Sequence, residues 1–186
     1  MYDPKSELLR MPPEVVAERV VEILPGGGVV VFTGGEPMLQ QEKVLHVAEI
    51  LSVMAAPGTL QFAVETAGTI APTIRFPFLQ EQWTVSPKLV NSGNGPARYR
   101  PKAIRAFVER GADFKFVLTS RDDLPEIESI VAVNDIEPQH VWLMPEGTDA
   151  TKLIERAQWV SQAALVRGWQ FTQRLHVLLW GDKRGH

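Results

Sequence analysis

The feature that most constrains the fold is an alternation between short apolar runs, rich in β-branched and aromatic residues, and longer segments with helical spacing. Val29–Phe32 is the first of these runs, and it is short and apolar enough for a buried strand of a parallel sheet. The later strand candidates are Leu60–Val64, Gln82–Val85, Phe114–Leu118 and Val141–Leu143. A chain that alternates strands and helices in this order is expected to fold as an α/β protein, with a parallel sheet and outer helices.

The segments between these runs have the apolar spacing of helices. The first helix is expected to begin at Pro12–Pro13, since a proline in the first turn loses no internal hydrogen bond. Its apolar face consists of Val16, Val20, Ile23 and Leu24. The second helix runs from about Gln41 to Met54, and its inward face consists of Val44, Val47, Ala48 and Leu51. Residues 101–110 form a third predicted helix, and the final apolar run, Leu175–Leu179, is predicted to be extended.

Two later helices carry capping signals at their first residues. Ser120 and Asp123 have the spacing of a capping box, and the helix that they open is expected to end near Val133. The last long helix is capped by Thr148 or Asp149. Both signals follow directly after strand candidates, which strengthens the prediction of a βα alternation.

Composition and charge exclude several classes of function. The chain has 186 residues, of which 45% are hydrophobic, and this predicts a single domain over residues 1–186. The net charge of −3 argues against a nucleic-acid-binding surface. No apolar run reaches membrane-spanning length, and the N-terminus lacks the basic and apolar pattern of a signal peptide, so a cytoplasmic location is expected.

The sequence contains no cysteine. Disulfides, thiolate zinc sites and a cysteine nucleophile are therefore excluded, and so is a cysteine-ligated iron–sulfur cluster held by these 186 residues. The four histidines have no spacing that suggests a metal site.

Polar residues collect directly after the predicted strands. These segments are Thr33–Pro37, Glu65–Thr69, Ser86–Lys88 and Pro145–Thr148. The carboxyl ends of parallel strands share one edge of the sheet, where α/β proteins bind their ligands. We therefore expect these segments to contribute to one binding site.

The turn after the first strand has two adjacent glycines, Gly34 and Gly35, which allow a ligand to approach the backbone closely. Together with the carboxylate of Glu36, such a turn suits an ammonium group. The alternative is a tight strand-to-helix turn with a solvated Glu36. The turn is neither a dinucleotide fingerprint nor a P-loop, because the glycine spacing of the first and the lysine of the second are absent.

Five further residues could serve a site or have an ordinary structural role. Glu65 could accept hydrogen bonds from ribose hydroxyls or a heterocycle, or it could be a turn acid. Lys88 could meet a ligand carboxylate or remain a surface lysine. Lys115, inside an apolar strand, points either into a pocket or out at a sheet edge. Arg174 and His176 either alternate toward a site or form an exposed strand face.

Seven motifs together resemble one known family. In chain order they are V-F-T-G-G-E-P-M-L-Q (31–40), E-T-A-G-T (65–69), V-S-P-K (85–88), N-S-G-N (91–94), F-K-F-V (114–117), L-M-P-E-G-T (143–148) and R-L-H-V-L-L-W-G (174–181). The pattern is similar to 7-carboxy-7-deazaguanine synthase, a branch of the radical S-adenosylmethionine (SAM) enzymes with an incomplete (βα) barrel. G-G-E-P alone marks the superfamily, whereas S-P-K with the C-terminal pattern makes the family specific. The resemblance extends from Tyr2 to Gly185.

This resemblance implies a reaction and its cofactors. The family converts 6-carboxy-5,6,7,8-tetrahydropterin, a small pterin substrate, into 7-carboxy-7-deazaguanine with loss of ammonia, on the path to queuosine and related bases. A [4Fe–4S] cluster cleaves SAM, the resulting deoxyadenosyl radical takes a hydrogen atom from the substrate, and Mg²⁺ assists. A homodimer is also implied.

The resemblance also implies roles for residues that match the motifs. The positions that match the family's substrate contacts are Thr33, Arg174 and His176. The SAM-binding positions are Gly34, Gly35, Glu36, Glu65, Ser86, Pro87, Lys88, Met144, Pro145 and Glu146. The match at 144–146 is weaker, because the family form there is Q-P-M-D. Lys115 is a further pocket residue.

One part of the family pattern is absent. The first βα unit of the family carries an L-Q-G-E-G stretch, the cluster cysteines and a C-D-T whose threonine helps to hold Mg²⁺, and none of these occurs here. The opening Y-D-P-K-S-E (2–7) resembles sequence that follows shortly after C-D-T. We therefore expect an N-terminally truncated synthase, inactive as given and with an uncovered strand edge. The alternatives are a cluster-free SAM- or pterin-binding protein, a dimer partner without catalysis, or a structural fragment with no ligand.

Overall fold

The computed structural model describes residues 9–73 and 82–181. The residues 2–7 that resemble the sequence after C-D-T, and Gly185 at the far end of the resemblance, lie outside this range. The chain divides into two compact units. The first holds the described residues up to Val64 together with Thr73 and Gln82, and the second holds Glu65–Pro72 and the described residues from Trp83 onward.

The six described strands form a sheet in the order β1-β2-β3-β4-β5-β6, which confirms the predicted α/β class. The strands are β1 (Gly28–Phe32), β2 (Leu60–Thr66), β3 (Gln82–Val85), β4 (Asp113–Leu118), β5 (Val141–Pro145) and β6 (Gln170–Phe171). The pairs β1–β2, β3–β4, β4–β5 and β5–β6 are parallel. The α-helices are α2 (Pro13–Ile23), α3 (Gln41–Met54), α4 (Pro101–Val108), α5 (Leu124–Val133), α6 (Ala150–Arg167) and α7 (Leu175–Trp180).

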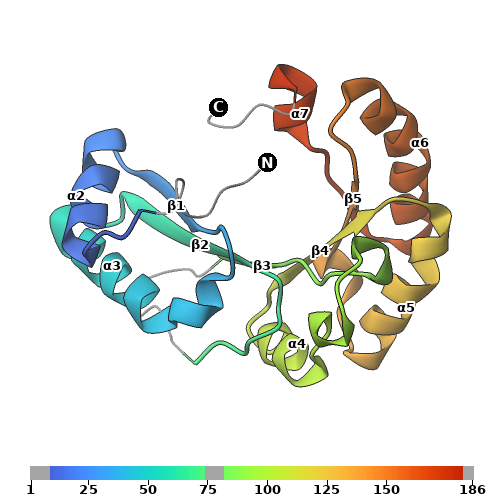
Figure 1. The fold of residues 1–186 in the computed structure, drawn as a ribbon, viewed down its shortest axis with the longest axis horizontal. Coiled ribbons are helices and arrows are strands. Elements are labelled where there is room, and N and C mark those ends of the chain that lie inside the picture. Colours follow the sequence, from blue (N-terminus) through green and yellow to red (C-terminus); the bar gives the residue numbers. More distant parts are fainter. Residues whose placement is uncertain (1–8, 74–81, 182–186) are drawn as a thin grey trace. The chain divides into compact units, whose positions relative to one another are not determined.

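In the first unit, α2 and α3 pack on each other and cover one face of β1 and β2 (Figure 1). The bounds of α3 and its buried residues Val44, Val47, Ala48 and Leu51 are those predicted from sequence. Ile23, by contrast, is 76% exposed, which corrects the predicted face of the first helix. The buried contact of α2 is at Ala17, and Ile23 lies roughly 120° around the helix from it at 100° per residue.

The strand β1 is not the fully buried strand that its apolar run predicted. Val29 and Val31 are 49% and 46% exposed, whereas Val30 and Phe32 are half-buried. The reason is that α2 and α3 cover one face of β1, and Val29 and Val31 lie on the other. A parallel strand is buried throughout only when both of its faces are covered.

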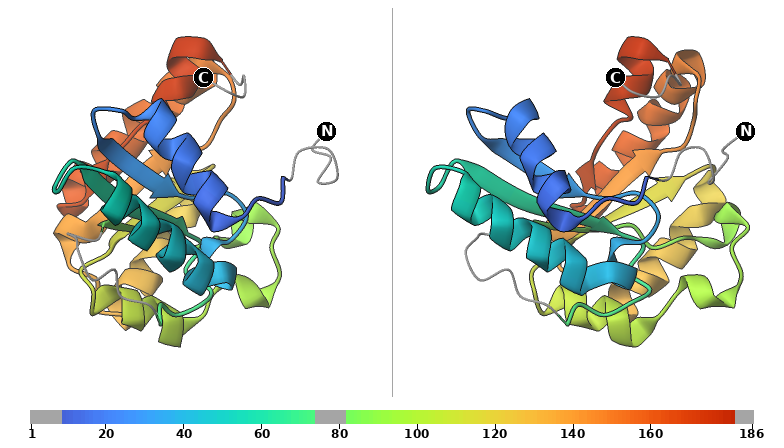
Figure 2. Two further views of the ribbon diagram at one scale, coloured as in Figure 1. Left: turned by 90° about the vertical axis from the view of Figure 1, so that its left-hand side faces the viewer. Right: turned by 60° about the vertical axis from the view of Figure 1, so that its left-hand side comes forward.

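In the second unit, α5 and α6 lie side by side against one face of β4 and β5 (Figure 2). Alternate residues of the two strands point into this layer, and the fully buried side chains include Phe107, Phe114, Phe116, Leu118, Ile127, Leu143 and Leu153. The helix starts are also as expected: Ser120 and Asp123 form the capping box, and the side chain of Asp149 accepts a hydrogen bond from the Lys152 N–H at the start of α6.

The last apolar run is helical, which corrects the prediction of an extended Leu175–Leu179. The N–H groups of Val177 and Leu178 donate to the Arg174 carbonyl, and the chain leaves the helix at Gly181 with a φ of 72°. Periodicity cannot distinguish a buried strand from a single helical turn in so short an apolar run. The strand of this region, β6, precedes the run and was not predicted.

Candidate functional site

The Ser86-Pro87-Lys88 turn follows β3 and is fixed to the end of β2. The Ser86 N–H donates to the Thr66 carbonyl over 2.7 Å, and the Thr66 hydroxyl oxygen accepts from the Gly68 N–H over 3.1 Å. Gly68 has a φ of +70°, and a Cβ there would lie 2.5 Å from the Val85 side chain. A glycine is therefore required where the two chain segments meet.

This turn forms one wall of a cavity of about 520 Å³ within the second unit. Its lining residues are Ser86, Pro87, Lys88, Leu89, Asn91, Ser92, Asn94, Val117, Thr119 and Glu146. They come from the ends of β3, β4 and β5 and from the loop after β3, and they include Ser86–Lys88 and Glu146 from the predicted segments. The volume falls in the range of small-molecule sites.

A buried carboxylate lies behind the cavity wall. One oxygen of Asp123 accepts hydrogen bonds from the Thr119 N–H over 2.7 Å, the Thr119 hydroxyl over 3.0 Å and the Ser120 N–H over 3.0 Å. Burial alone would raise the pKa of Asp123, but the hydrogen bonds from Ser120, Thr119 and the Asn91 side chain stabilise the charged form. The net effect is a pKa below the ordinary value of 3.8, so the group is ionised at neutral pH.

The loop that carries Asn91 is tied to the start of α5. The carboxylate of Glu126 accepts from the Val90 N–H over 2.9 Å and from the Arg98 guanidinium over 3.1 Å. Between these two contacts the chain forms two short 3₁₀ turns, η2 (Val90–Ser92) and η3 (Pro96–Arg98). Glu126 therefore holds both ends of the segment that contributes Asn91 to the cavity.

The turn after β5 is held by two arginines. The Arg156 guanidinium of α6 lies 2.5 Å from a carboxylate oxygen of Glu146 and also donates to the Glu146 carbonyl. Arg174 donates to the Gly147 carbonyl over 2.6 Å. The Glu146 N–H donates to the Leu118 carbonyl over 2.8 Å, which joins the turn to the end of β4. The predicted ligand residue Glu146 is thus fixed in position before any ligand arrives.

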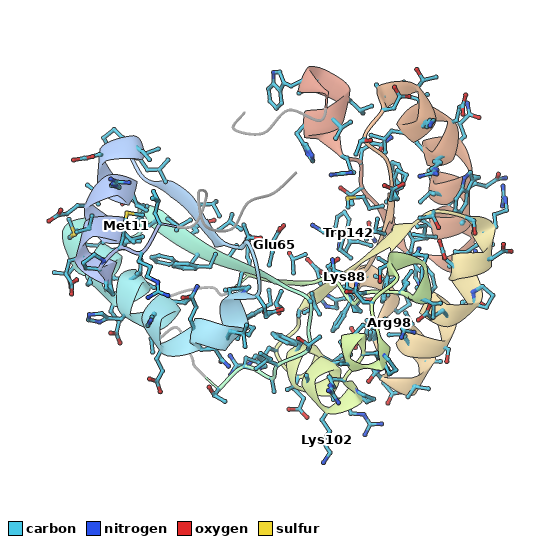
Figure 3. The ribbon with its side chains drawn as sticks, in the orientation of Figure 1. Met11, Glu65, Lys88, Arg98, Lys102 and Trp142 are labelled. Atoms are coloured by element: carbon cyan, nitrogen blue, oxygen red, sulfur yellow. The ribbon has the colours of Figure 1, made fainter. Side chains whose placement is uncertain are left out.

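A charged pair occupies the face of the sheet that the helices leave open. Lys115 Nζ lies 3.3 Å from a carboxylate oxygen of Glu65, so Lys115 points out of the core toward this face. Trp142 is opposite Lys115 in the β4–β5 register, and its indole N–H is buried without a hydrogen-bond partner in the described part of the chain. In Figure 3, Glu65 and Trp142 lie on this open side, whereas Lys102 projects away from the sheet on α4.

The glycine turn after β1 belongs to the first unit. Thr33, Gly34 and Gly35 are exposed, with left-handed φ values of 81° and 58° at the two glycines. The Glu36 carboxylate accepts from the Met38 N–H over 3.1 Å and so caps the short helix η1 (Pro37–Gln40). The local geometry is a tight strand-to-helix turn with open space over both glycines. The ligand roles of Thr33, Gly34, Gly35 and Glu36 stay predictions.

The remaining predicted residues differ in their surroundings. Met144 is opposite Val117 on the open face of the sheet, and Pro145 is buried at the end of β5. Arg174 donates a hydrogen bond to the Gly147 carbonyl, and His176 is exposed on α7. Neither Arg174 nor His176 lines the 520 Å³ cavity, and their substrate contacts stay predictions.

Sequence reasoning missed four residues of this region: Asn91, Thr119, Asp123 and Trp142. The sequence marks Asn91 only within the N-S-G-N motif, and Asp123 only as part of a helix cap. The useful signal was position, since Thr119 follows the end of β4 as directly as Ser86 follows β3, and Asp123 lies in the short turn that comes next. A carboxylate buried at such a point must be satisfied by neighbouring donors, and those donors form the cavity wall.

The implied cofactors fit these residues to different degrees. A cavity with a lysine, a carboxylate and several neutral acceptors suits a zwitterionic nucleoside such as SAM. A cysteine-ligated cluster does not fit, because the sequence has no cysteine. Over the described ranges, no group of three or more acidic or histidine side chains is placed to hold a metal ion.

None of the described helices is long and apolar enough to cross a membrane.

The fold is similar to that of two solved structures. SuiB from Streptococcus suis matches with a TM-score of 0.60 over 94% of this chain, at 16% identity, and SuiB bound to S-adenosylmethionine matches with 0.59 over 92%. The chain spans 46% of the length of these SuiB chains. At this identity the likeness shows the fold alone, an α/β fold with a parallel sheet.

Sequence relatives define the family. The chain is 34% identical over 172 residues to the 7-carboxy-7-deazaguanine synthase of Pyrobaculum aerophilum, covering 92% of this chain and 73% of the relative. It is 36% identical over 179 residues to the synthase of Halobacterium salinarum, covering 82% and 65%. No family model matches the chain. The chain belongs to the 7-carboxy-7-deazaguanine synthase family, as its motifs predicted.

Proposed function

We propose that these residues form the ligand-binding part of an enzyme that converts 6-carboxy-5,6,7,8-tetrahydropterin into 7-carboxy-7-deazaguanine with loss of ammonia. The observation that carries the proposal is the cavity in which the Ser86–Lys88 turn meets Glu146, in a chain 34% identical to a curated synthase. Both segments were assigned to SAM from their motifs, and they line one cavity of suitable volume.

The proposed SAM contacts follow from the charges of the ligand. SAM carries a carboxylate, an ammonium group and a sulfonium, together with the neutral donors and acceptors of adenosine. Lys88 is placed to pair with the carboxylate, while Ser86 offers a hydroxyl to the nucleoside. Gly34, Gly35 and Glu36 are proposed to receive the ammonium group. The cofactor supplies the radical chemistry, and these residues bind and orient it.

The proposed substrate contacts suit a flat, carboxylated heterocycle. Lys115 offers a cation for the pterin carboxylate, while Glu65, which pairs with Lys115, is proposed to accept hydrogen bonds from SAM. Thr33, Arg174 and His176 are proposed as further contacts, as their motifs imply. We further propose a homodimer that acts on this small molecule in the cytoplasm and binds no nucleic acid.

These residues do not supply the ligands that an iron–sulfur cluster needs. The 186 residues contain no cysteine, so reductive SAM cleavage needs thiolate ligands from another source. We expect no 5′-deoxyadenosine from this chain alone after reconstitution with iron and sulfide. Formation of 5′-deoxyadenosine, with contaminating enzymes excluded, would contradict this expectation.

Titration calorimetry of the chain with SAM tests the proposed binding directly. Micromolar binding is expected, and Lys88→Met is expected to weaken it about tenfold by removing the partner of the ligand carboxylate. Lys102→Met is the matched control, because Lys102 is an exposed lysine on the outer helix α4. Failure of the folded chain to bind SAM, or equal affinity of the two variants and wild type, contradicts the proposal.

A further inference from the structure

Asp123 controls which atoms the cavity wall presents. The side chain is only 8% exposed and does not line the cavity, yet it contacts two residues that do. It accepts the hydroxyl hydrogen and the N–H of Thr119, and the Asn91 side chain also donates to it. Any ligand in the cavity meets Thr119 and Asn91 in the orientations that Asp123 imposes.

The hydrogen-bond directions determine the polarity of the wall. The Thr119 hydroxyl donates its hydrogen to Asp123, so only the lone pairs of its oxygen are available to a ligand. One amide hydrogen of Asn91 goes to the Val117 carbonyl at 3.3 Å, and Asp123 also accepts from this amide. Two acceptors therefore fix the NH₂ end of Asn91 against the protein, and its carbonyl oxygen remains for the cavity.

We propose that Asp123 is a positioning residue for SAM binding, which holds Thr119 and Asn91 so that both present acceptor oxygens to the hydroxyl and amino donors of the adenosyl group. The inference rests on the proposed SAM binding. Neutral oxygens match neutral donors of the nucleoside, whereas the ammonium group of the ligand is better served by a carboxylate. The negative charge of Asp123 reaches the ligand only through Thr119 and Asn91.

An Asp123→Asn variant tests the polarity of the wall with little change in shape. An asparagine retains an oxygen for Thr119 and Ser120, but its NH₂ group opposes the NH₂ of Asn91 and turns that amide around. SAM affinity is expected to fall about tenfold, and the affinity for 5′-methylthioadenosine, which lacks the amino-acid part, is expected to fall by the same factor. Asp122→Asn, at an exposed neighbouring position, is expected to keep wild-type affinity.

A double-mutant cycle separates positioning from a general loss of stability. Thr119→Val removes the hydroxyl with little change in volume, and Thr119→Ser restores it. If Asp123 acts through Thr119, the combined Asp123→Asn/Thr119→Val variant binds SAM more tightly than the product of the two single effects predicts. If the two single losses of SAM affinity simply multiply in the double variant, Asp123 does not act through Thr119. The same conclusion follows if Thr119→Ser binds SAM as weakly as Thr119→Val.

Each outcome has a defined consequence. If wild type does not bind SAM, the proposed function fails and this inference fails with it. If wild type binds and Asp123→Asn binds equally well, the inference alone fails. A loss seen with SAM but not with 5′-methylthioadenosine overturns the assignment to the adenosyl group. If Asp123→Asn does not fold, Asn91→Ala on the exposed loop decides, and its full affinity for both ligands overturns the inference.

Discussion

The turns after β1 and β3 carry the two strongest motifs of the chain, but their surroundings differ. The turn after β1 is exposed, and a Cβ on Gly34 or Gly35 would meet no atom within 4 Å. The turn after β3 is bonded to β2 and forms part of a cavity whose wall is held by Asp123 and Glu126. A motif identifies the residue types of a site, but the neighbouring elements decide how rigidly those residues are held.

The largest expected effect comes from the core of the second unit. Phe116→Ala empties a fully buried position on β4 and should lower the free energy of unfolding by about 3–5 kcal/mol. Val31→Ala on β1 should lower it by less than about 1 kcal/mol, because half of that side chain is already exposed. Urea denaturation of both variants measures the difference, and similar losses would remove the contrast between the two regions.

A second comparison uses the glycines of the two regions. Gly68→Ala should destabilise by about 2–4 kcal/mol, because its Cβ would overlap the Val85 side chain in addition to the left-handed backbone strain. Gly34→Ala should cost only the backbone strain, about 1 kcal/mol. Thermal melts of the two variants provide the measurement. A smaller loss for Gly68→Ala than for Gly34→Ala would show that the β2–β3 contact is looser than described.

Asp123 gives the second unit a distinctive dependence on pH. Asp123→Asn should lower the free energy of unfolding by about 1–3 kcal/mol at pH 7. Because the folded-state pKa lies below the ordinary 3.8, this contribution is fully present above pH 3.8 and disappears as pH falls through the folded-state value. Denaturation of both proteins from pH 7 to pH 3 tests this. Asp149→Asn is the control, since asparagine caps helices about as well as aspartate, and a pH-independent gap for Asp123→Asn would contradict the sign.

The smallest effect concerns the ion pair on the open face of the sheet. Glu65→Gln should change stability by less than about 1 kcal/mol, because both partners are partly exposed to water. Its proposed role is in SAM binding, so any loss of SAM affinity should exceed the loss of stability. Binding and melting measurements on the same variant separate the two. A large loss of stability would make the pair a structural element instead.

The local patterns of the sequence predicted regular elements well. The bounds of α3 and β3, and the capping box at Ser120, were as expected because spacing and capping act over a few residues. The short run at residues 175–179 and the exposure of Val29 and Val31 were not predicted correctly. Helix or strand in a short run, and burial of a strand face, depend on which elements cover that segment.

The site was predictable to a similar extent. The Ser86–Lys88 turn and Glu146 line one cavity, and this follows from the order of strands in a parallel sheet. The contribution of Asp123 was not predictable, because the donors that surround it come from the loop after β3 and from the end of β4. Their convergence depends on tertiary packing, and no spacing in the sequence records it.

The exposed valines of β1 also affect how the protein is handled. Within the described range, one side of this strand has no neighbour in the sheet, and its outward face is apolar at Val29 and Val31. Such a strand can pair with a strand of another molecule, so concentrated samples are expected to form oligomers or precipitate on storage. A lysine in place of Val31 would put a charge where natural edge strands often carry one, and would extend the useful lifetime of purified material.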